Sequence, residues 1–286
     1  MPDTTTQVPT ITLNDGRAIP QLGFGVFQIP PEDTREATRL ALDTGYRHID
    51  TAEMYQNEAG VGEAFRDSGL ARDEVWITSK LNNGAHKPDD ARRAMEETLK
   101  QLGLDYVDLF LIHWPLPTRY DGDFVSTWKA MEEFHADGRA RSIGVSNFQV
   151  PHLEQLAQTC DVVPAVNQIE VHPYLLNREV RGYCEQHGIA VEAWSPIAQG
   201  GVLDDSVITG IAETVGRTPA QVVLRWHIQH GLIVFPKSVT PERVRENFAL
   251  FDFELSGEDV AAIDGLDKGE EGRTGPNPDS FDMVPD

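Results

Sequence analysis

The sequence predicts an α/β fold in which eight parallel strands alternate with helices and close into a (β/α)8 TIM barrel. Eight short apolar runs recur along the chain, separated by segments with the period of amphipathic helices. The runs are apolar throughout, as expected for parallel strands buried on both faces. A doubly wound sheet is disfavoured because no Gly-x-Gly-x-x-Gly loop follows the first run and no break in composition divides the chain. We therefore expect a single domain over residues 1–286.

The predicted elements begin with a β-hairpin that lies outside the repeat and is expected across the bottom of the barrel. Residues 11–13 and 17–19 flank Asn14-Asp15-Gly16, and an Asp-Gly pair readily adopts the positive φ angles of a tight turn. The predicted strands are residues 23–27, 46–50, 75–80, 106–113, 142–145, 165–170, 190–194 and 232–236. The predicted helices are residues 31–43, 58–68, 88–102, 124–136 and 219–229, with others beginning near Pro151, Arg178 and Pro241.

Two further segments require an interpretation of their own. Gly23 and Gly25 lie inside the first strand run, so we interpret them as points of close backbone packing rather than as a dinucleotide loop. Residues 1–9 and about 270–286 are expected to be loop or flexible. The tail from residue 267 onward is rich in Gly, Pro and acidic residues, which predicts a surface loop or disordered end; folding over the barrel mouth is the alternative.

Composition limits the classes of function. A net charge of −22 and a pI near 4.7 disfavour nucleic acid and anionic membranes as partners, because binding either requires Lys and Arg to neutralise phosphates. No apolar stretch is long enough to span a bilayer, and the start of the chain lacks the features of a signal peptide. Two cysteines provide no disulfide framework. We expect a soluble cytoplasmic protein, and a monomer.

Polar side chains end most of the apolar runs, and in a barrel these ends meet on the catalytic face. Taken singly, each has a structural explanation: a helix cap for Asp50, an extended side chain reaching solvent for Lys80, or a core position for His113. Their coincidence at matching strand ends favours a site. The full set is Asp50, Lys80, His113, Ser146, Asn147, Gln168, Glu170, Trp194, Ser195, Lys237 and Ser238.

Two other uses of such residues are disfavoured. The nine histidines form no His-Glu-x-x-His motif and the cysteines no Cys-x-x-Cys pair, so no metal site is predicted. Nucleophilic catalysis lacks support because the segment around Ser146 has no nucleophile elbow and neither cysteine ends a strand.

Asp50, Tyr55, Lys80 and His113 together are suited to protonating an oxygen that gains negative charge. A phenol with a pKa of about 10 is a weak acid at neutral pH unless a cation stabilises the phenolate, and Lys80 can supply that cation while Asp50 holds it. His113 offers a second hydrogen bond to the same oxygen. Carbonyl reduction fits this arrangement.

The segment after the eighth strand indicates a phosphate site. Lys237 and Ser238 precede a helix that carries Arg243, and barrels often bind phosphate in this loop. The alternative is a basic helix face that neutralises nearby acids.

At this point the chain resembles the aldo-keto reductase family, over a region from the hairpin to at least Phe253. The similar motifs are Gly45-Tyr-Arg-His-Ile-Asp-Thr-Ala with Glu58 and Gly62 downstream, Leu111-Ile-His-Trp-Pro115, Gly144-Val-Ser-Asn-Phe148 and Pro236-Lys-Ser-Val-Thr-Pro-Glu-Arg. Within the family, the chain is most similar to the bacterial branch of 2,5-diketo-D-gluconate reductase-like and actinobacterial enzymes.

The resemblance implies specific roles. Asp50, Tyr55, Lys80 and His113 match the catalytic tetrad, with Tyr55 as the general acid. Ser146, Asn147 and Gln168 match the residues that hold the nicotinamide carboxamide, and Trp194 matches the aromatic residue that stacks on the ring. The positions matching contacts to pyrophosphate, 2′-phosphate and adenine are Ser195, Lys237, Ser238, Arg243 and Asn247, which implies NADPH as cofactor. One departure concerns the substrate pocket: Asn82-Asn83 occupies the place where many relatives carry a tryptophan wall.

The sequence thus predicts an oxidoreductase that transfers a hydride from NADPH to an aldehyde, ketone or α-dicarbonyl. Two alternatives remain: a non-catalytic, NADPH-binding regulatory barrel, and an isomerase that uses the phosphate site for its substrate.

Overall fold

The computed structural model describes residues 8–285, so residues 1–7 and 286, which include most of the segment expected to be flexible at the start, lie outside it. Eight parallel strands form one sheet in the order β10-β9-β8-β7-β6-β5-β4-β3. A parallel bridge between Leu22 and Val234 joins its two edges and closes the barrel. The strands are β3 (Phe24–Gly25), β4 (His48–Asp50), β5 (Trp76–Leu81), β6 (Val107–Ile112), β7 (Ala140–Ser146), β8 (Val166–Glu170), β9 (Ala190–Trp194) and β10 (Ile233–Val234). The predicted TIM barrel is confirmed.

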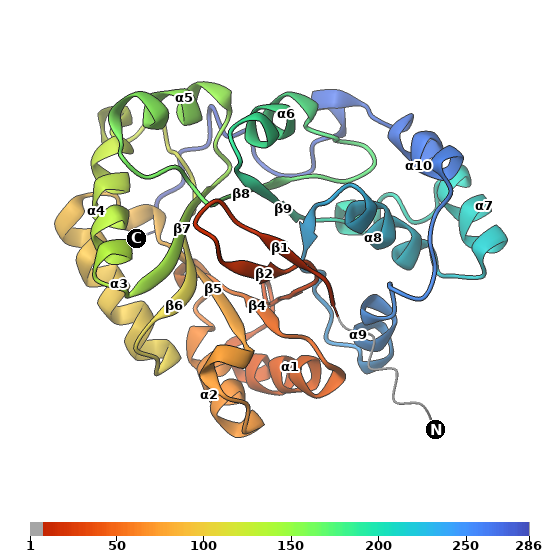
Figure 1. The fold of residues 1–286 in the computed structure, drawn as a ribbon, viewed down its shortest axis with the longest axis horizontal. Coiled ribbons are helices and arrows are strands. Elements are labelled where there is room, and N and C mark those ends of the chain that lie inside the picture. Colours follow the sequence, from red (N-terminus) through yellow and green to blue (C-terminus); the bar gives the residue numbers. More distant parts are fainter. Residues whose placement is uncertain (1–7, 286) are drawn as a thin grey trace.

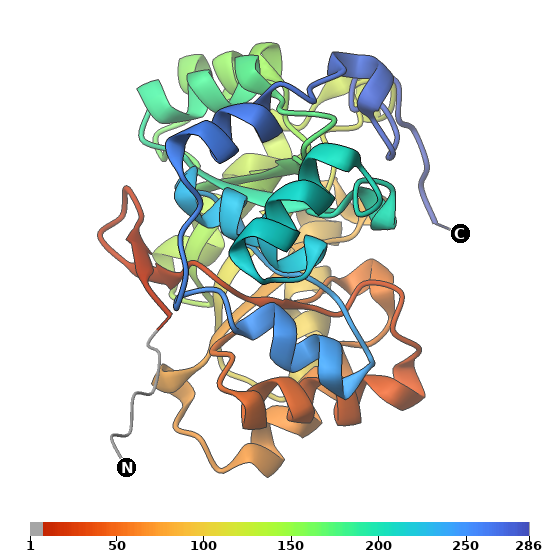
Figure 2. The same cartoon turned by 90° about the vertical axis from the view of Figure 1, so that its right-hand side faces the viewer.

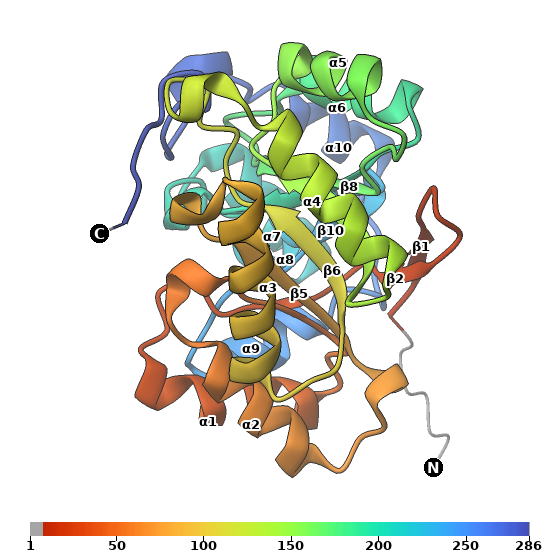
Figure 3. The same cartoon turned by 90° about the vertical axis from the view of Figure 1, so that its left-hand side faces the viewer.

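Helices surround the barrel (Figures 1 and 3). They are α1 (Pro31–Thr44), α2 (Glu58–Ser68), α3 (Pro88–Leu102), α4 (Val125–Ala136), α5 (Val150–Thr159), α6 (Arg178–Gln186), α7 (Ser206–Val215), α8 (Pro219–Gln229), α9 (Pro241–Phe248) and α10 (Gly257–Asp264). Short 3-10 helices are η1 (Glu53–Tyr55), η2 (Arg72–Glu74), η3 (Asn83–Ala85), η4 (Tyr120–Gly122), η5 (Ala198–Gly200) and η6 (Gly269–Gly272). Sequence analysis missed α7 and α10. Gly210 weakens the helical pattern of α7, and α10 buries only Ile263.

The hairpin closes the bottom of the barrel, as predicted. β1 (Thr10–Thr12) pairs with β2 (Ala18–Pro20), and both Leu13 and Ile19 are buried in a cluster with side chains of the barrel strands. Figure 2 shows the hairpin at one end of the molecule and the C-terminal tail at the other. The carboxyl ends of the strands therefore face the tail.

The glycines of the first strand lie at close contacts inside the barrel. A Cβ atom on Gly23 would lie 2.8 Å from the His48 ring, and one on Gly25 would lie 2.7 Å from the Phe235 carbonyl oxygen. No other residue fits without displacing its neighbours. The interpretation of Gly23 and Gly25 as packing positions is confirmed.

The tail is bound over the mouth of the barrel rather than being a free surface end. The backbone amides of Thr274 and Gly275 donate hydrogen bonds to the buried Glu170 carboxylate at the end of β8. Further along, Asn83 Nδ2 donates to the Met283 carbonyl oxygen at 2.9 Å. A buried carboxylate needs donors, and the tail supplies them to Glu170. Composition alone did not reveal this, because the partners are distant in sequence.

We expect Gly62 to be essential to the packing of α2 against α3. A Cβ at this buried position would lie 2.0 Å from the Leu102 carbonyl oxygen, so Gly62→Ala requires the two helices to separate. Overpacking of this kind costs about 1–3 kcal/mol or more, which urea denaturation measures as a lower midpoint.

Gly210→Ala is the matched control for this prediction. Gly210 also lies within a helix, but a Cβ there meets no atom within 4 Å. Alanine at such a site stabilises a helix by roughly 0.5–1 kcal/mol. Equal stability of the two variants would contradict the steric role assigned to Gly62.

Candidate active site

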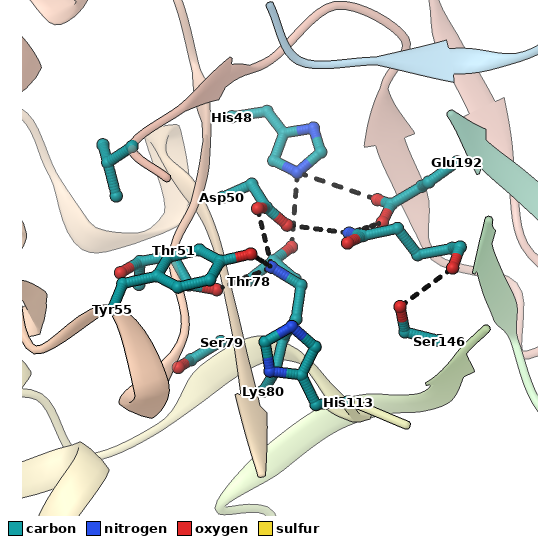
Figure 4. Close-up of polar contacts among 12 residues, drawn as sticks. His48, Asp50, Thr51, Tyr55, Thr78, Ser79, Lys80, His113, Ser146 and Glu192 are labelled. Carbon is teal, nitrogen blue, oxygen red and sulfur yellow. Dashed lines mark hydrogen bonds and ion pairs between the residues drawn. The ribbon is translucent and has the colours of Figure 1, made fainter. Parts of the chain in front are cut away.

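A lysine connects an acid and a tyrosine at the mouth of the barrel (Figure 4). Lys80 on β5 is fully buried, and its Nζ donates to Asp50 Oδ1 at 2.7 Å and to the Thr51 carbonyl oxygen at 2.9 Å. The same Nζ lies 3.3 Å from Tyr55 Oη. Asp50 ends β4, and Tyr55 ends η1 in the loop beyond it. The structure thus brings these three predicted residues together.

His113 lies beside Tyr55, directly after β6. The centroids of the two rings are 5.7 Å apart, at an interplanar angle of 74°. Nδ1 of His113 is buried and has no hydrogen-bond partner among residues 8–285. Because an unpaired buried N–H is costlier than an unpaired lone pair, we assign the ring hydrogen to Nε2, the nitrogen free to face a ligand.

Burial and the lysine charge set the proton affinities of this group. Burial raises the pKa of Tyr55, and Lys80 only partly opposes that rise. Burial alone lowers the pKa of Lys80, but Asp50 and Tyr55 more than compensate, and its net pKa is raised. Burial and Lys80 together hold the pKa of His113 well below its usual value. At neutral pH, Tyr55 therefore keeps its proton, Lys80 is an ammonium and His113 is a neutral imidazole.

The net change in the pKa of Tyr55 is opposite in direction to the one expected from Lys80. The lysine was expected to make the phenol a stronger acid, and it does lower the pKa, but burial has the larger effect. Lys80 therefore limits the rise in the pKa of Tyr55 and does not lower that pKa below its usual value.

A second set of predicted residues lies across the mouth at the ends of β7, β8 and β9. Ser146 Oγ donates to the Gln168 carbonyl oxygen at 2.8 Å, and Asn147 Nδ2 donates to the His113 carbonyl oxygen at 2.9 Å. Asn147 Oδ1 accepts from Trp194 Nε1 at 2.8 Å. These bonds connect the side chains of Asn147 and Trp194 to the backbone that carries His113, and tie the Ser146 side chain to β8.

Asn147 and Ser195, each next to a strand end, have left-handed backbones, with φ of 65° and 48°. Residues other than glycine adopt this conformation at a cost, and such residues cluster at functional sites. At Asn147 the turn follows directly after β7 and places its amide between His113 and Trp194.

The predicted phosphate residues follow the last strand. Lys237 and Ser238 lie in the loop after β10, and Arg243 and Asn247 lie on α9. Lys237 and Arg243 are exposed, and neither forms an ion pair with a carboxylate of residues 8–285. The alternative of a basic face that neutralises nearby acids therefore has no support from ion pairs in the described chain.

Sequence analysis missed two buried groups behind the tetrad, Glu192 and His48. Gln168 Nε2 donates to both Asp50 Oδ2 and Glu192 Oε2, and His48 Nε2 lies 3.8 Å from Glu192 Oε1. The available signal was the single acid in Ala190-Val-Glu-Ala-Trp194, which shares a strand face with Trp194.

Two aromatic pairs lie close to the site residues or to the tail. Phe281 of the tail packs on Trp114 with ring centroids 4.2 Å apart, and Phe27 packs on Tyr55 at 4.9 Å. Asn83 holds the tail through Met283. Asn83 thus anchors the tail segment whose Phe281 packs on Trp114.

The fold and the site define a class of protein: a TIM barrel with a buried Asp–Lys pair beneath a tyrosine and a histidine at its mouth. The chain belongs to the aldo/keto reductase family, whose sequence model matches residues 21–209 and 204–268. No helix within residues 8–285 has the length and apolar character needed to cross a membrane.

Similar proteins cover almost the whole chain. An aldo-keto reductase of Mycolicibacterium smegmatis is 52% identical over 96% of this chain and 99% of its own length. The methylglyoxal reductase DkgA of Yersinia pestis is 49% identical over 96% of this chain and 98% of its own. Among solved structures, a variant of Gox0644 in complex with NADPH has a TM-score of 0.92 and 45% identity, covering 96% of this chain and 99% of that one.

Proposed function

We propose that this chain is an NADPH-dependent reductase of aldehydes, ketones or α-dicarbonyls. The observation that carries the proposal is the contact of Lys80 Nζ with both Asp50 and Tyr55, at the mouth of a family barrel and next to His113. The similarity to a methylglyoxal reductase and to an NADPH complex supports the substrate class and the cofactor.

In this proposal Tyr55 is the general acid. Its Oη donates a proton to the carbonyl oxygen as negative charge develops there, and Lys80 stabilises the phenolate that forms. The Nε2–H of His113 donates a hydrogen bond to the same oxygen. Asp50 acts by holding Lys80 in place. NADPH supplies the hydride that reduces the carbonyl carbon.

The chain has groups that fit this cofactor. Among residues 8–285 no hydrogen bond ends on Gln168 Oε1, which leaves an acceptor for the carboxamide N–H. Ser146 bonds the backbone carbonyl of Gln168, and Asn147 bonds Ser146. The half-buried Trp194 presents an aromatic surface for the nicotinamide ring. The groups proposed for pyrophosphate, 2′-phosphate and adenine are Ser195, Lys237, Ser238, Arg243 and Asn247.

The free cations predict a strong preference for NADPH over NADH. We expect Lys237→Ala and Arg243→Ala each to raise the KM for NADPH about tenfold to a hundredfold, because charge-assisted hydrogen bonds to a phosphate are worth roughly 1.5–3 kcal/mol. The KM for NADH, which lacks the 2′-phosphate, should change little. Initial rates with both cofactors measure the difference.

Arg245→Ala is the matched control, since Arg245 is an exposed arginine on the same helix and is assigned no cofactor contact. An equal rise in the KM for NADPH in Arg245→Ala would show that the overall positive charge of the helix, and not a specific phosphate site, sets the preference for NADPH over NADH.

The function itself is tested by NADPH consumption with methylglyoxal, aromatic aldehydes and keto sugars. Turnover with at least one carbonyl is expected. NADPH binding without any turnover would instead favour the regulatory barrel. Absence of NADPH binding, measured by tryptophan fluorescence, would favour the phosphate-using isomerase.

The proposal also includes a monomer in the cytoplasm, formed as one domain over residues 1–286. It is supported by the single barrel, the two unpaired cysteines and the strongly acidic composition.

A further inference from the structure

The orientation of the Gln168 side chain is determined by two acids from neighbouring strands. Its Nε2 donates to Asp50 Oδ2 at 2.8 Å and to Glu192 Oε2 at 2.7 Å. Glu192 is fully buried on β9, directly beside Gln168 in the β8–β9 register. Both hydrogens of the amide are therefore used, one by each carboxyl group.

This arrangement selects one of the two orientations of the amide. If the amide flipped, Gln168 Oε1 would lie 2.8 Å from Asp50 Oδ2, an oxygen of the carboxylate that is paired with Lys80, and two acceptors would meet in a buried space. In the observed orientation Oε1 instead receives no hydrogen bond from residues 8–285. Glu192 and Asp50 thus leave the amide oxygen, and not its nitrogen, available to a ligand.

The contacts of His48 bear on the protonation of Glu192, the second acid buried inside the barrel beside Asp50. Its Nδ1 lies 3.2 Å from the Pro20 carbonyl oxygen and must carry the hydrogen, so Nε2 has a lone pair that accepts from Thr78 Oγ1. That nitrogen, which carries no hydrogen, lies 3.8 Å from Glu192 Oε1, and Oε1 has no partner in the described chain.

A carboxylate at Glu192 would leave an anionic oxygen buried without a hydrogen-bond donor among residues 8–285, whereas a neutral acid would bury no charge there. In agreement with this geometry, burial and the nearby Asp50 raise the pKa of Glu192 to about 8, and burial lowers the pKa of His48 to about 3. Glu192 therefore supplies a hydrogen-bond acceptor to Gln168 without adding a second negative charge beside Lys80.

We propose that Glu192 is a positioning residue that fixes the Gln168 amide so that its oxygen accepts a hydrogen bond from the carboxamide N–H of the nicotinamide cofactor. The inference rests on the proposed function, since it requires that the cofactor bind at Gln168. Asp50 alone occupies only one of the two amide hydrogens, so without Glu192 the second hydrogen has no buried partner and one hydrogen bond instead of two holds the amide in this orientation.

The test compares two ligands that differ only in the carboxamide. One is NADP+, and the other is its analogue with an acetyl group in place of the carboxamide, which lacks the N–H donor. Dissociation constants come from the quenching of tryptophan fluorescence. In the natural chain NADP+ should bind about tenfold more tightly than the analogue, as expected for the loss of one hydrogen bond to a buried acceptor.

Three variants locate the cause of that preference. Glu192→Leu removes the acceptor at similar volume, and the preference should fall to about twofold or less as the Gln168 amide loses its fixed orientation. Glu192→Gln keeps an oxygen that can accept from Gln168 Nε2 and should retain the tenfold preference. If Glu192→Leu does not fold, as judged by circular dichroism, Glu192→Met carries the same test with an unbranched side chain.

The outcomes separate this inference from the proposed function. A preference that persists in the folded Leu or Met variant, or that is lost equally in Glu192→Gln, overturns the positioning role alone. If the natural chain binds neither ligand, the proposed cofactor fails together with this inference.

Discussion

Tyr55→Phe is expected to lower kcat for carbonyl reduction by about a thousandfold or more while NADPH binding is unchanged. The substitution removes only the phenolic O–H, which in the proposed mechanism both transfers a proton and donates a hydrogen bond to the developing oxyanion. General acids typically contribute 10²–10⁴-fold and oxyanion donors a similar factor. Stopped-flow or steady-state NADPH oxidation gives kcat, and fluorescence titration gives the NADPH dissociation constant.

The ring of Tyr55 also packs on Phe27 and beside His113, so phenylalanine preserves the packing that alanine would remove. Tyr183→Phe, on the outer helix α6, is the matched control and should leave kcat unchanged. Retention of more than about a tenth of the turnover in Tyr55→Phe would rule out the general-acid role.

Lys80→Met should lower both stability and activity, because it removes the only cation that Asp50 contacts among residues 8–285. Side-chain exposure is 0% for Lys80 and 2% for Asp50, so the acid remains buried without its partner. Breaking such a pair from one side costs about 3–5 kcal/mol. Urea denaturation should show the loss as a lower free energy of unfolding, and kcat should fall because Tyr55 loses the charge that stabilises its phenolate.

An ion pair at the surface provides the comparison for the buried Asp50–Lys80 pair. Arg35 and Asp67 also form an ion pair, but their side chains are 55% and 35% exposed, so Arg35→Met should cost about 1 kcal/mol or less. Adding Asp50→Asn to Lys80→Met should recover part of the stability by removing the isolated charge, without restoring turnover. Similar losses in the Lys80 and Arg35 variants would show that burial does not control the energy of the Asp50–Lys80 pair.

Sequence periodicity predicted the barrel because each strand is short, apolar and followed by a helix, which are local properties of the chain. Elements without a strong local pattern were missed for the same reason. Helix α7 buries Ile208, Ile211 and Ala212 at helical spacing but contains Gly210, which has a low helix propensity, and α10 buries a single side chain.

The candidate residues were predictable to the extent that they end strands. The rule that strand ends meet on one face selected Asp50, Lys80, His113 and Gln168 without knowledge of any distance. Glu192 was not selected, although it lies beside Gln168 in the sheet register, and neither was His48, which begins β4. Their importance arises from contacts across the barrel interior, where residues on β4, β8 and β9 meet.

The sequence by itself thus determined the fold, the residues at the barrel mouth and the family resemblance, because these depend on local pattern and on motif order. Only the tertiary structure decided how those residues are arranged: which way the Gln168 amide points, why Tyr55 keeps its proton, and where the tail lies. Each of these depends on burial and on partners far apart in the chain, such as Glu170 with Thr274. Burial and long-range contacts follow from closure of the barrel, which no single segment of the sequence specifies.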